Sequence, residues 1–231
     1  MNNKFIDADL GQVVFVRNGR AKNIIARKKR DFIQITLPAF YSTKQALKAF
    51  EELKPQLLSL KSKPVYRFFP DQEFKTFSFR LVMTQNNLQN FYVQLKNEIL
   101  SLTYPSDCNF EDSEIQETIR VFVEKALRYE AKRIFPQKVK FFAEQHGFEF
   151  LDVKINKSRS RWGSCSGKKG INLSYFCMLL PEHLVDFVIL HELCHTVEMN
   201  HGEHFWALLD IVSKGRAKEF TRELKNTTIN W

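Results

Sequence analysis

Four of the six histidines in the chain lie within residues 191–206, HELCHTVEMNHGEHFW. His191 and His195 are four positions apart, and Glu192 directly follows the first of them. On a helix, positions i and i+4 lie on the same face about one turn apart, so both imidazoles can reach one metal ion. Catalytic zinc typically has three protein ligands and a water. Because Glu192 can take a proton from that water and deliver it to a leaving group, this H-E-x-x-H pattern predicts a hydrolytic zinc site with Glu192 as general base and acid.

The third zinc ligand is expected to be His201. It follows His195 by six positions, which on a continuous helix would turn its side chain about 240° away from the metal. The helix must therefore end between the two histidines, and Asn200 and Gly202 are residue types that end helices in the left-handed conformation. His204, at the start of the next predicted helix, is the alternative histidine ligand.

Other side chains near the motif have less defined roles. Glu219 or Glu223 is a third option as a ligand, and the Glu198 carboxylate is a candidate to hold a ligand imidazole by a hydrogen bond. Cys194 lies about 100° from His195 around the helix, so it is interpreted as a small buried residue.

Hydrophobic periodicity predicts the elements that position the motif. A buried helix is expected over 181–199, because residues 184–190 are almost wholly apolar, and another helix over 203–214. Pro55 is expected to end or kink an earlier helix. No internal repeat is evident. The remaining expected helices are 42–62, 113–134 and 137–145, and the expected strands are 12–17, 23–26, 31–38, 74–83, 90–95, 148–155 and 170–180.

The period changes from strand-like to helix-like near residues 106–112. We therefore expect an α+β chain with a basic, β-rich N-terminal region (1–110) and a catalytic domain (111–231). The first region has 17 Lys/Arg against 9 Asp/Glu, and the second has 18 against 17. Such a basic domain either attracts phosphate, nucleic acid or acidic surfaces, or simply has a well-solvated surface.

Cysteine usage and apolar runs bear on the compartment. The four cysteines are dispersed and form no C-x-x-C pair. The N-terminal residues lack the apolar stretch of a signal peptide, and the longest apolar runs are too short to span a bilayer. These features predict a cytoplasmic protein with free thiols and no membrane segment.

Further motifs precede the histidines: Arg161-Trp-Gly-Ser-Cys-Ser166, Gly170-Ile-Asn-Leu and Pro181. Together with the histidine motif, they resemble the YgjP-like metal-dependent hydrolases, which are close to the SprT-like and WLM zincin metallopeptidases. The resemblance spans about residues 115–215 and, more weakly, the N-terminal strands.

This resemblance implies a zincin-like C-terminal domain with an active-site helix and a small sheet. Carried onto this chain, it implies zinc ligands at His191, His195 and His201 and a general base at Glu192. It also suggests that the strand at 170–178 is an edge strand that pairs with an extended peptide substrate.

A cluster of basic residues lies beside these motifs and contains no acid. Its members are Lys154, Lys157, Arg159, Arg161, Lys168 and Lys169. It is either a charged surface loop or a patch that attracts an anionic substrate or a nucleic-acid strand. A zinc-dependent peptidase is the favoured function. The alternatives are a metal-dependent hydrolase of phosphoanhydrides such as nucleoside triphosphates, and a zinc-containing nucleic-acid-binding module, which would not need Glu192.

Overall fold

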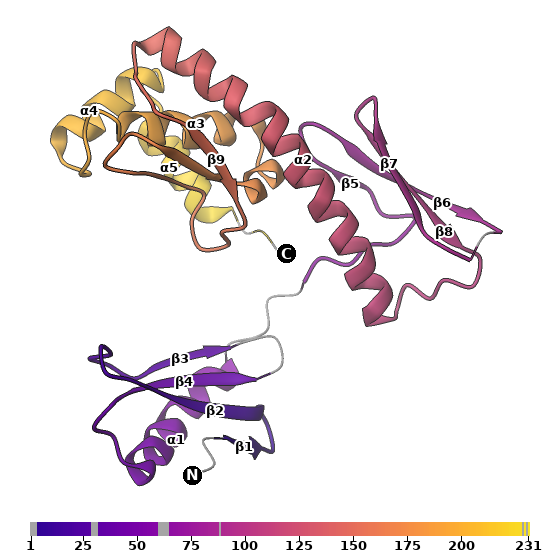
Figure 1. The fold of residues 1–231 in the computed structure, drawn as a ribbon, viewed down its shortest axis with the longest axis vertical. Helices are drawn as coiled ribbons and strands as arrows, with labels where there is room; N and C mark the ends of the chain where they lie inside the picture. Colours follow the sequence, from indigo (N-terminus) through magenta and orange to yellow (C-terminus); the bar gives the residue numbers. More distant parts are fainter. Residues whose placement is uncertain (1–3, 29–31, 60–64, 88, 228, 230) are drawn as a thin grey trace. The chain divides into compact units, whose positions relative to one another are not determined.

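The computed structural model describes residues 4–28, 32–59, 65–87, 89–227, 229 and 231. The chain divides into two compact units, Met1–Val65 and Tyr66–Trp231, called here the N-terminal unit and the C-terminal unit. Both contain helices and sheets (Figure 1), so the expected α+β class is confirmed. The expected boundary at 110–111 falls within the C-terminal unit, and the division of the chain into folding domains stays a prediction.

The N-terminal unit is a four-stranded sheet with one helix against it. Its elements are β1 (Lys4–Asp7), β2 (Gly11–Asn18), β3 (Ile25–Lys28), β4 (Ile33–Pro38) and α1 (Thr43–Ser59). The strand order is β1-β2-β4-β3. Alternate residues of β4, namely Ile33, Ile35 and Leu37, are buried against Phe50 and Leu57 of α1. The strict alternation of apolar residues thus specifies the face of the sheet that the helix covers.

Pro55 does not end α1, which continues to Ser59. A proline inside a helix costs about 3 kcal/mol. Burial of a large apolar side chain returns about 1.5–3 kcal/mol, and Phe50 and Leu57 are buried on either side of the proline. The apolar face therefore outweighs the local break that the sequence predicted.

The C-terminal unit begins with a second four-stranded sheet. Its strands are β5 (Phe74–Lys75), β6 (Arg80–Asn86), β7 (Tyr92–Lys96) and β8 (Ile99–Pro105), in the order β5-β6-β8-β7. This order and the strand directions equal those of the first sheet, and a helix again follows the last strand. The repeat was not evident in the sequence.

The two sheets also share their register. Corresponding Cα partners are Phe5↔Val13 and Phe74↔Leu81, Val13↔Ile33 and Leu81↔Leu100, and Lys28↔Ile33 and Leu95↔Leu100. In both sheets the central parallel pair ends with an asparagine opposite a proline, Asn18 with Pro38 and Asn86 with Pro105. The same arrangement is therefore built twice from two sets of mostly different side chains.

Helix α2 (Ser113–His146) replaces the two helices expected over this range. The Asp112 side chain accepts a hydrogen bond from the backbone N–H of Glu114 at 2.8 Å, and Gly147 ends the helix with φ 72°. Both ends match the sequence prediction. Pro136 lies inside the helix, between the buried Phe135 and Val139. In Figure 1, α2 runs from the sheet of β5–β8 to the elements that carry the histidines.

The rest of the unit is a three-stranded sheet and three helices. The elements are β9 (Val153–Asn156), β10 (Gly163–Cys165), β11 (Ile171–Ser174), the 3₁₀ helix η1 (Tyr175–Leu179), α3 (Glu182–Cys194), α4 (Glu203–Val212) and α5 (Ala217–Asn226). The strand order is β10-β11-β9. Since β11 has a neighbour on each side, the expectation that residues 170–178 form an edge strand is wrong. Within the described residues, β10 is an edge strand of this sheet, and it contacts α3.

None of the helices among the described residues has both the length and the apolar character needed to cross a membrane.

Candidate metal centre

Helix α3 carries the H-E-x-x-H motif and is a core helix. From Leu184 to Cys194 every residue is buried except Asp186 and His191, which are partly exposed. Lys138 of α2 holds the start of α3, because its Nζ lies 2.8 Å from the Asp186 carboxylate and also pairs with Glu182. Burial on nearly all sides fixes the helix, and with it the direction of the motif side chains.

The chain turns directly after Cys194, five residues earlier than expected. The turn is made by backbone hydrogen bonds from Thr196 to Leu193 at 2.9 Å and from Glu198 to Cys194 at 2.8 Å. Within the described residues, neither Asn200 nor Gly202 has a positive φ, so the expected left-handed end is wrong. A tightening of the last helical turn reverses the chain instead.

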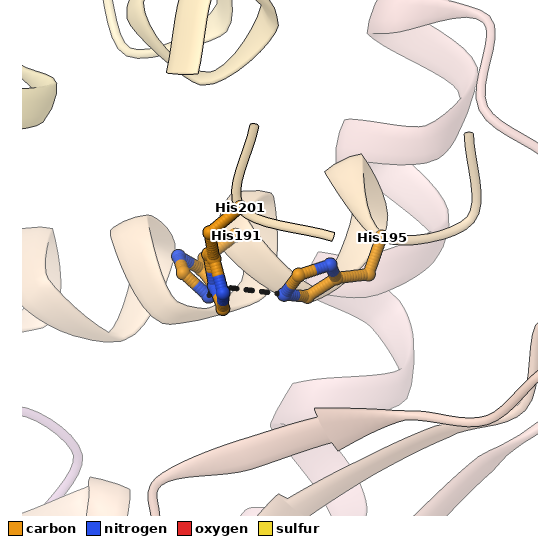
Figure 2. Close-up of side chains that lie close together, drawn as sticks. All are labelled: His191, His195 and His201. Atoms are coloured by element: carbon orange, nitrogen blue, oxygen red, sulfur yellow. Dashed lines mark hydrogen bonds between the residues drawn. The ribbon is translucent and has the colours of Figure 1, made fainter. Parts of the chain in front are cut away.

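This turn brings the three predicted ligands together. His191 lies in the last turn of α3, His195 caps its C-terminus, and His201 follows in the loop before α4. The Nε2 atom of His201 lies 3.2 Å from that of His195 and 3.1 Å from that of His191. Figure 2 shows the three imidazoles converging, and their ligand atoms all lie within 4.8 Å of one another.

A hydrogen bond fixes the tautomer of His195. Its Nδ1 lies 3.0 Å from the backbone carbonyl oxygen of Glu198. A carbonyl oxygen only accepts, so Nδ1 carries the proton and the lone pair of Nε2 faces the other imidazoles. The sequence offered the Glu198 carboxylate as a candidate for this orienting role, whereas the group that contacts His195 is the main-chain carbonyl of the same residue.

The donor set fits a zinc ion. Tetrahedral zinc with imidazole nitrogens at about 2.0–2.1 Å would separate two nitrogens by about 3.3 Å, close to the spacing of the Nε2 atoms here. Burial, and then the neighbouring imidazoles, lowers the pKa of His191 to about 4, and burial also lowers the pKa of His195. Both imidazoles are therefore neutral at pH 7, which is the form that binds metals.

The Glu192 side chain lies against β10 at Gly163, where the absence of a Cβ atom leaves room for it. A Cβ atom at Gly163 would lie 2.6 Å from Glu192 Oε1 and 2.7 Å from its Cγ. The Glu192 carboxyl is buried, and its Oε2 has no hydrogen-bond partner among the described residues. Burial raises the pKa of Glu192 to about 7, although the charge of Arg161 lowers it. A carboxyl in such a place can both take up and release a proton near neutral pH.

The alternative ligands lie elsewhere or have other partners. His204 is exposed in the first turn of α4 and does not belong to the three-histidine group. Glu219 forms two hydrogen bonds with Arg216, and Glu223 lies 2.9 Å from His183. Cys194 is fully buried, as expected. All four cysteines are free thiols.

The basic cluster of residues 154–169 is partly neutralised, since three carboxylates pair with four of its six cations. Lys157 and Arg159 both pair with Glu124 of α2. Lys154 and Lys169 pair with Asp152 and Glu149, respectively. These partners lie outside the acid-free stretch, so the sequence did not indicate them. Four of the six cations therefore have structural partners, which favours the charged-loop interpretation of the cluster.

Sequence reasoning missed two residues that shape the centre. Phe205 of α4 is fully buried, and its ring centroid lies 4.5–4.9 Å from those of all three imidazoles. Gly163 is the other, because it admits the Glu192 carboxyl. Phe205 had a detectable signal, since it lies four residues after His201 at the start of an apolar helix.

An H-E-x-x-H helix, a third histidine after a turn and a buried glutamate together are typical of metal-dependent hydrolases. A family model described as "YgjP-like, metallopeptidase domain" matches residues 22–227. The chain therefore belongs to the YgjP-like family, and its general class is that of a metal-dependent peptidase, for which the substrate is a peptide or a protein.

Two solved structures are also similar to the chain. One is the metallopeptidase zymogen of Pyrococcus abyssi abylysin, with 22% identity, a TM-score of 0.35, and coverage of 38% of this chain and 89% of that one. The other is the metallopeptidase zymogen of Methanocaldococcus jannaschii jannalysin, with 24% identity, a TM-score of 0.35, and coverage of 38% and 91%. No curated protein matches the chain.

Proposed function

We propose that this protein is a zinc-dependent peptidase in which His191, His195 and His201 hold the ion and Glu192 is the general base and acid. The observation that carries the proposal is the meeting of three imidazole nitrogens beside one buried, incompletely hydrogen-bonded carboxyl. When bound, zinc supplies Lewis acidity, polarising a carbonyl oxygen and lowering the pKa of water.

The side chains of the site divide the remaining work. The Glu198 carbonyl keeps the Nε2 lone pair of His195 directed at the ion, and Phe205 excludes water from behind the imidazoles. Glu192 accepts a proton from the attacking water and passes it to the leaving amine nitrogen. Three histidines leave a zinc coordination position open, as catalysis requires.

The open edge of β10 is suited to hold the peptide. A substrate strand added there would form main-chain hydrogen bonds, which bind many sequences with little selectivity. Gly163 and Glu192 are already in close contact at this strand, so a peptide bond lying along β10 would pass near the general base.

Peptide-bond cleavage is favoured over the two alternatives. A phosphoanhydride hydrolase or a nucleic-acid-binding module was suggested by the basic cluster at 154–169. Because three acids pair with four of the six cations in that cluster, it favours an anionic ligand less than the sequence suggested. Glu192 would have no function in a purely structural zinc site, which four ligands would close.

Glu192→Gln tests the mechanism, because it keeps the shape of the side chain and removes the base. Cleavage of casein or a quenched fluorescent peptide should fall by about 10²–10⁴-fold, while the zinc content measured by atomic absorption stays at the wild-type value. Unchanged turnover would exclude Glu192 as the base. Hydrolysis of nucleoside triphosphates by the wild-type protein, without peptide cleavage, would instead support the phosphoanhydride alternative.

A further inference from the structure

A groove of about 670 Å³ lies between α4 and α5, beside the metal centre. Trp206, Ala207 and Asp210 line it from α4, and Ala217 and Thr221 are among the residues that line it from α5. Small residues on both helices leave the space open, and the Trp206 ring supplies a broad apolar wall. The groove can therefore hold side chains of a bound chain.

Trp206 joins this groove to the metal centre. Its ring centroid lies 6.0 Å from that of His201, and the side chain remains 38% exposed. One face of the groove thus begins at a predicted zinc ligand. A peptide bound across the three imidazoles would reach the groove if it continued past Trp206.

Three cations of α5 also line the groove: Lys218, Arg222 and Lys225. Their spacing of four and three positions places them along one helix face. Among the described residues, none of them has an ion-pair partner, whereas Asp210 lines the same groove and accepts a hydrogen bond from the N–H of Ala217. The groove therefore has an excess of positive charge.

The acids of α5 do not neutralise this face. Glu219 pairs with Arg216 at 2.7 Å, and Glu223 pairs with His183 at 2.9 Å. Both acids are engaged with residues that do not line the groove. On α5, therefore, the three cations that line the groove are available to bind an anionic group, whereas the two acids are paired elsewhere.

We propose that this groove is a subsite for an acidic stretch of the peptide substrate; the inference rests on the proposed peptidase function. At about 1.5 Å per helical residue, Lys218 to Lys225 extends over about 10 Å. At about 3.3 Å per residue, an extended peptide presents about three residues over that length. A short run of Asp or Glu matches both the length and the sign of the charge.

Charge and shape favour a peptide over a nucleic-acid strand. Grooves that bind single strands combine cations with several aromatic rings on which successive bases stack. Trp206 is the one aromatic residue that lines this groove, and the rest of its non-cationic lining is small side chains and Asp210.

Binding to the full-length Glu192→Gln chain loaded with zinc tests the subsite without turnover. Fluorescence anisotropy compares two labelled peptides that differ only in a block of three Glu or three Gln. We expect the Glu peptide to bind about five- to tenfold more tightly at low salt, and the difference to shrink at high salt. Lys218→Glu combined with Arg222→Glu should remove that preference. Lys132→Glu, at an exposed position on α2 outside the groove, is the matched control and should retain it.

The outcomes separate the subsite from the peptidase function. Equal binding of both peptides, or a preference that survives the double reversal in a chain with an unchanged melting temperature, would overturn the subsite. Wild-type cleavage of both peptides at equal rates would leave the peptidase intact and reject the subsite. Binding that depends on the groove, without cleavage by the wild type, would reject the peptidase alone. The groove would be assigned to nucleic acid if a single-stranded oligonucleotide bound more tightly than the Glu peptide and the double variant Lys218→Glu, Arg222→Glu lost that binding.

Discussion

At the scale of single residues, each of the three histidines reaches the centre by a different route. His191 is held by a helix, His195 by a helix end and a carbonyl, and His201 by the loop that follows. The ring of Phe205 contacts all three, so they share one wall. The residue types and spacing predict His191 and His195 as partners, but the third position depends on the path of the loop.

The two later histidines are a matched pair of mutations. His201→Ala removes a nitrogen that lies 3.1–3.2 Å from the other two, whereas His204→Ala removes an exposed ring outside the group. We expect His201→Ala to weaken zinc binding by more than about 100-fold, since loss of an orienting partner alone costs 10–100-fold. Competition with a chromophoric chelator measures the affinity. A larger loss in His204→Ala would transfer the ligand role to that residue.

A glycine is required at position 163 because a larger residue would clash with Glu192, not because the backbone has an unusual conformation. Its φ is not positive, and a Cβ atom would meet the carboxyl of Glu192 at 2.6–2.8 Å. A contact of that length forces one partner to move. Because Glu192 is the proposed base, even a shift of about 1 Å at this position can cost about 100-fold in rate.

Gly163→Ala should therefore lower peptide cleavage by about 10- to 100-fold while His191, His195 and His201 still bind zinc. Overpacking should also lower stability by about 1–3 kcal/mol. Gly167→Ala is the control, because a Cβ atom there meets nothing within 4 Å and φ is not positive. Turnover, zinc content and thermal melting of the two variants provide the comparison. Equal activity of both variants would show that Glu192 can move without loss of function.

At the scale of elements, the sequence predicts helices best where apolar residues repeat over many turns. The two helices predicted at 113–134 and 137–145 leave a gap that contains Pro136, and a proline inside a helix costs about 3 kcal/mol. The structure keeps one helix because the buried Phe135 and Val139 continue the same apolar face across the proline. Local preference and long-range burial thus compete, and only the second depends on partners distant in sequence.

The missed elements have weak local signals. β10 has three residues and begins with a glycine, so its pairing with β11 defines it more than its own side chains do. Helix α5 is rich in charged residues and buries only Ala217 and Phe220, which leaves too few apolar positions to show a helical period. Both elements line proposed functional surfaces, so the proposed substrate sites were less predictable than the proposed metal ligands.

Glu124 of α2 ties three segments of the C-terminal unit together. Its carboxylate pairs with Lys157 and Arg159 of the loop after β9, accepts a hydrogen bond from the Tyr175 hydroxyl at 2.9 Å, and accepts one from Trp231 Nε1 at 2.9 Å. Burial raises the pKa of Glu124, but the bonds from Lys157, Trp231 and Tyr175 outweigh it and hold the pKa below the ordinary value of 4.5. The ionised form is therefore the one that stabilises the fold.

Since the folded-state pKa of Glu124 is lowered, its contribution is complete above pH 4.5 and is lost as the pH falls through the folded-state value. Glu124→Gln should lower the melting temperature by roughly 3–6 °C at pH 7, and the gap from wild type should close in acid. Thermal melts between pH 7 and pH 3 measure this gap. Glu144→Gln, an exposed carboxylate on the same helix, is the control. A gap that stays constant with pH would assign the effect to packing alone.

At the scale of the whole molecule, the excess positive charge lies in the N-terminal unit, and the candidate metal centre lies in the C-terminal unit. Residues 1–65 have 13 Lys/Arg against 5 Asp/Glu, whereas residues 66–231 have 22 against 21. The basic character expected for residues 1–110 is thus confined to the N-terminal unit. Its sheet repeats the topology and register of β5–β8, but only the second copy continues into the elements that carry the histidines. The repeat is not evident in the sequence because matching positions, such as Phe15 and Met83, share apolar character but not identity.

The separation of the units predicts two unfolding events in the full-length chain. Among the described residues, the core cluster of the N-terminal unit contains eight buried apolar residues, and units of about 60 residues bury too little surface to be very stable. The unit should therefore melt first. Every residue proposed for metal binding, proton transfer and the groove lies between Gly163 and Lys225, inside the other unit's core or surface.

A truncated chain of residues 66–231 should therefore lose the lower-temperature transition in calorimetry and keep the upper one within a few degrees. It should still bind one zinc ion per chain and cleave short peptides at the full-length rate, because His191, His195, His201 and Glu192 all lie within residues 66–231. Loss of zinc or failure to fold would show that the basic unit is part of the catalytic domain. Retained cleavage of short peptides with slower cleavage of whole proteins would instead assign the basic unit to capturing large substrates, a role its excess of eight positive charges suits when the substrate is acidic.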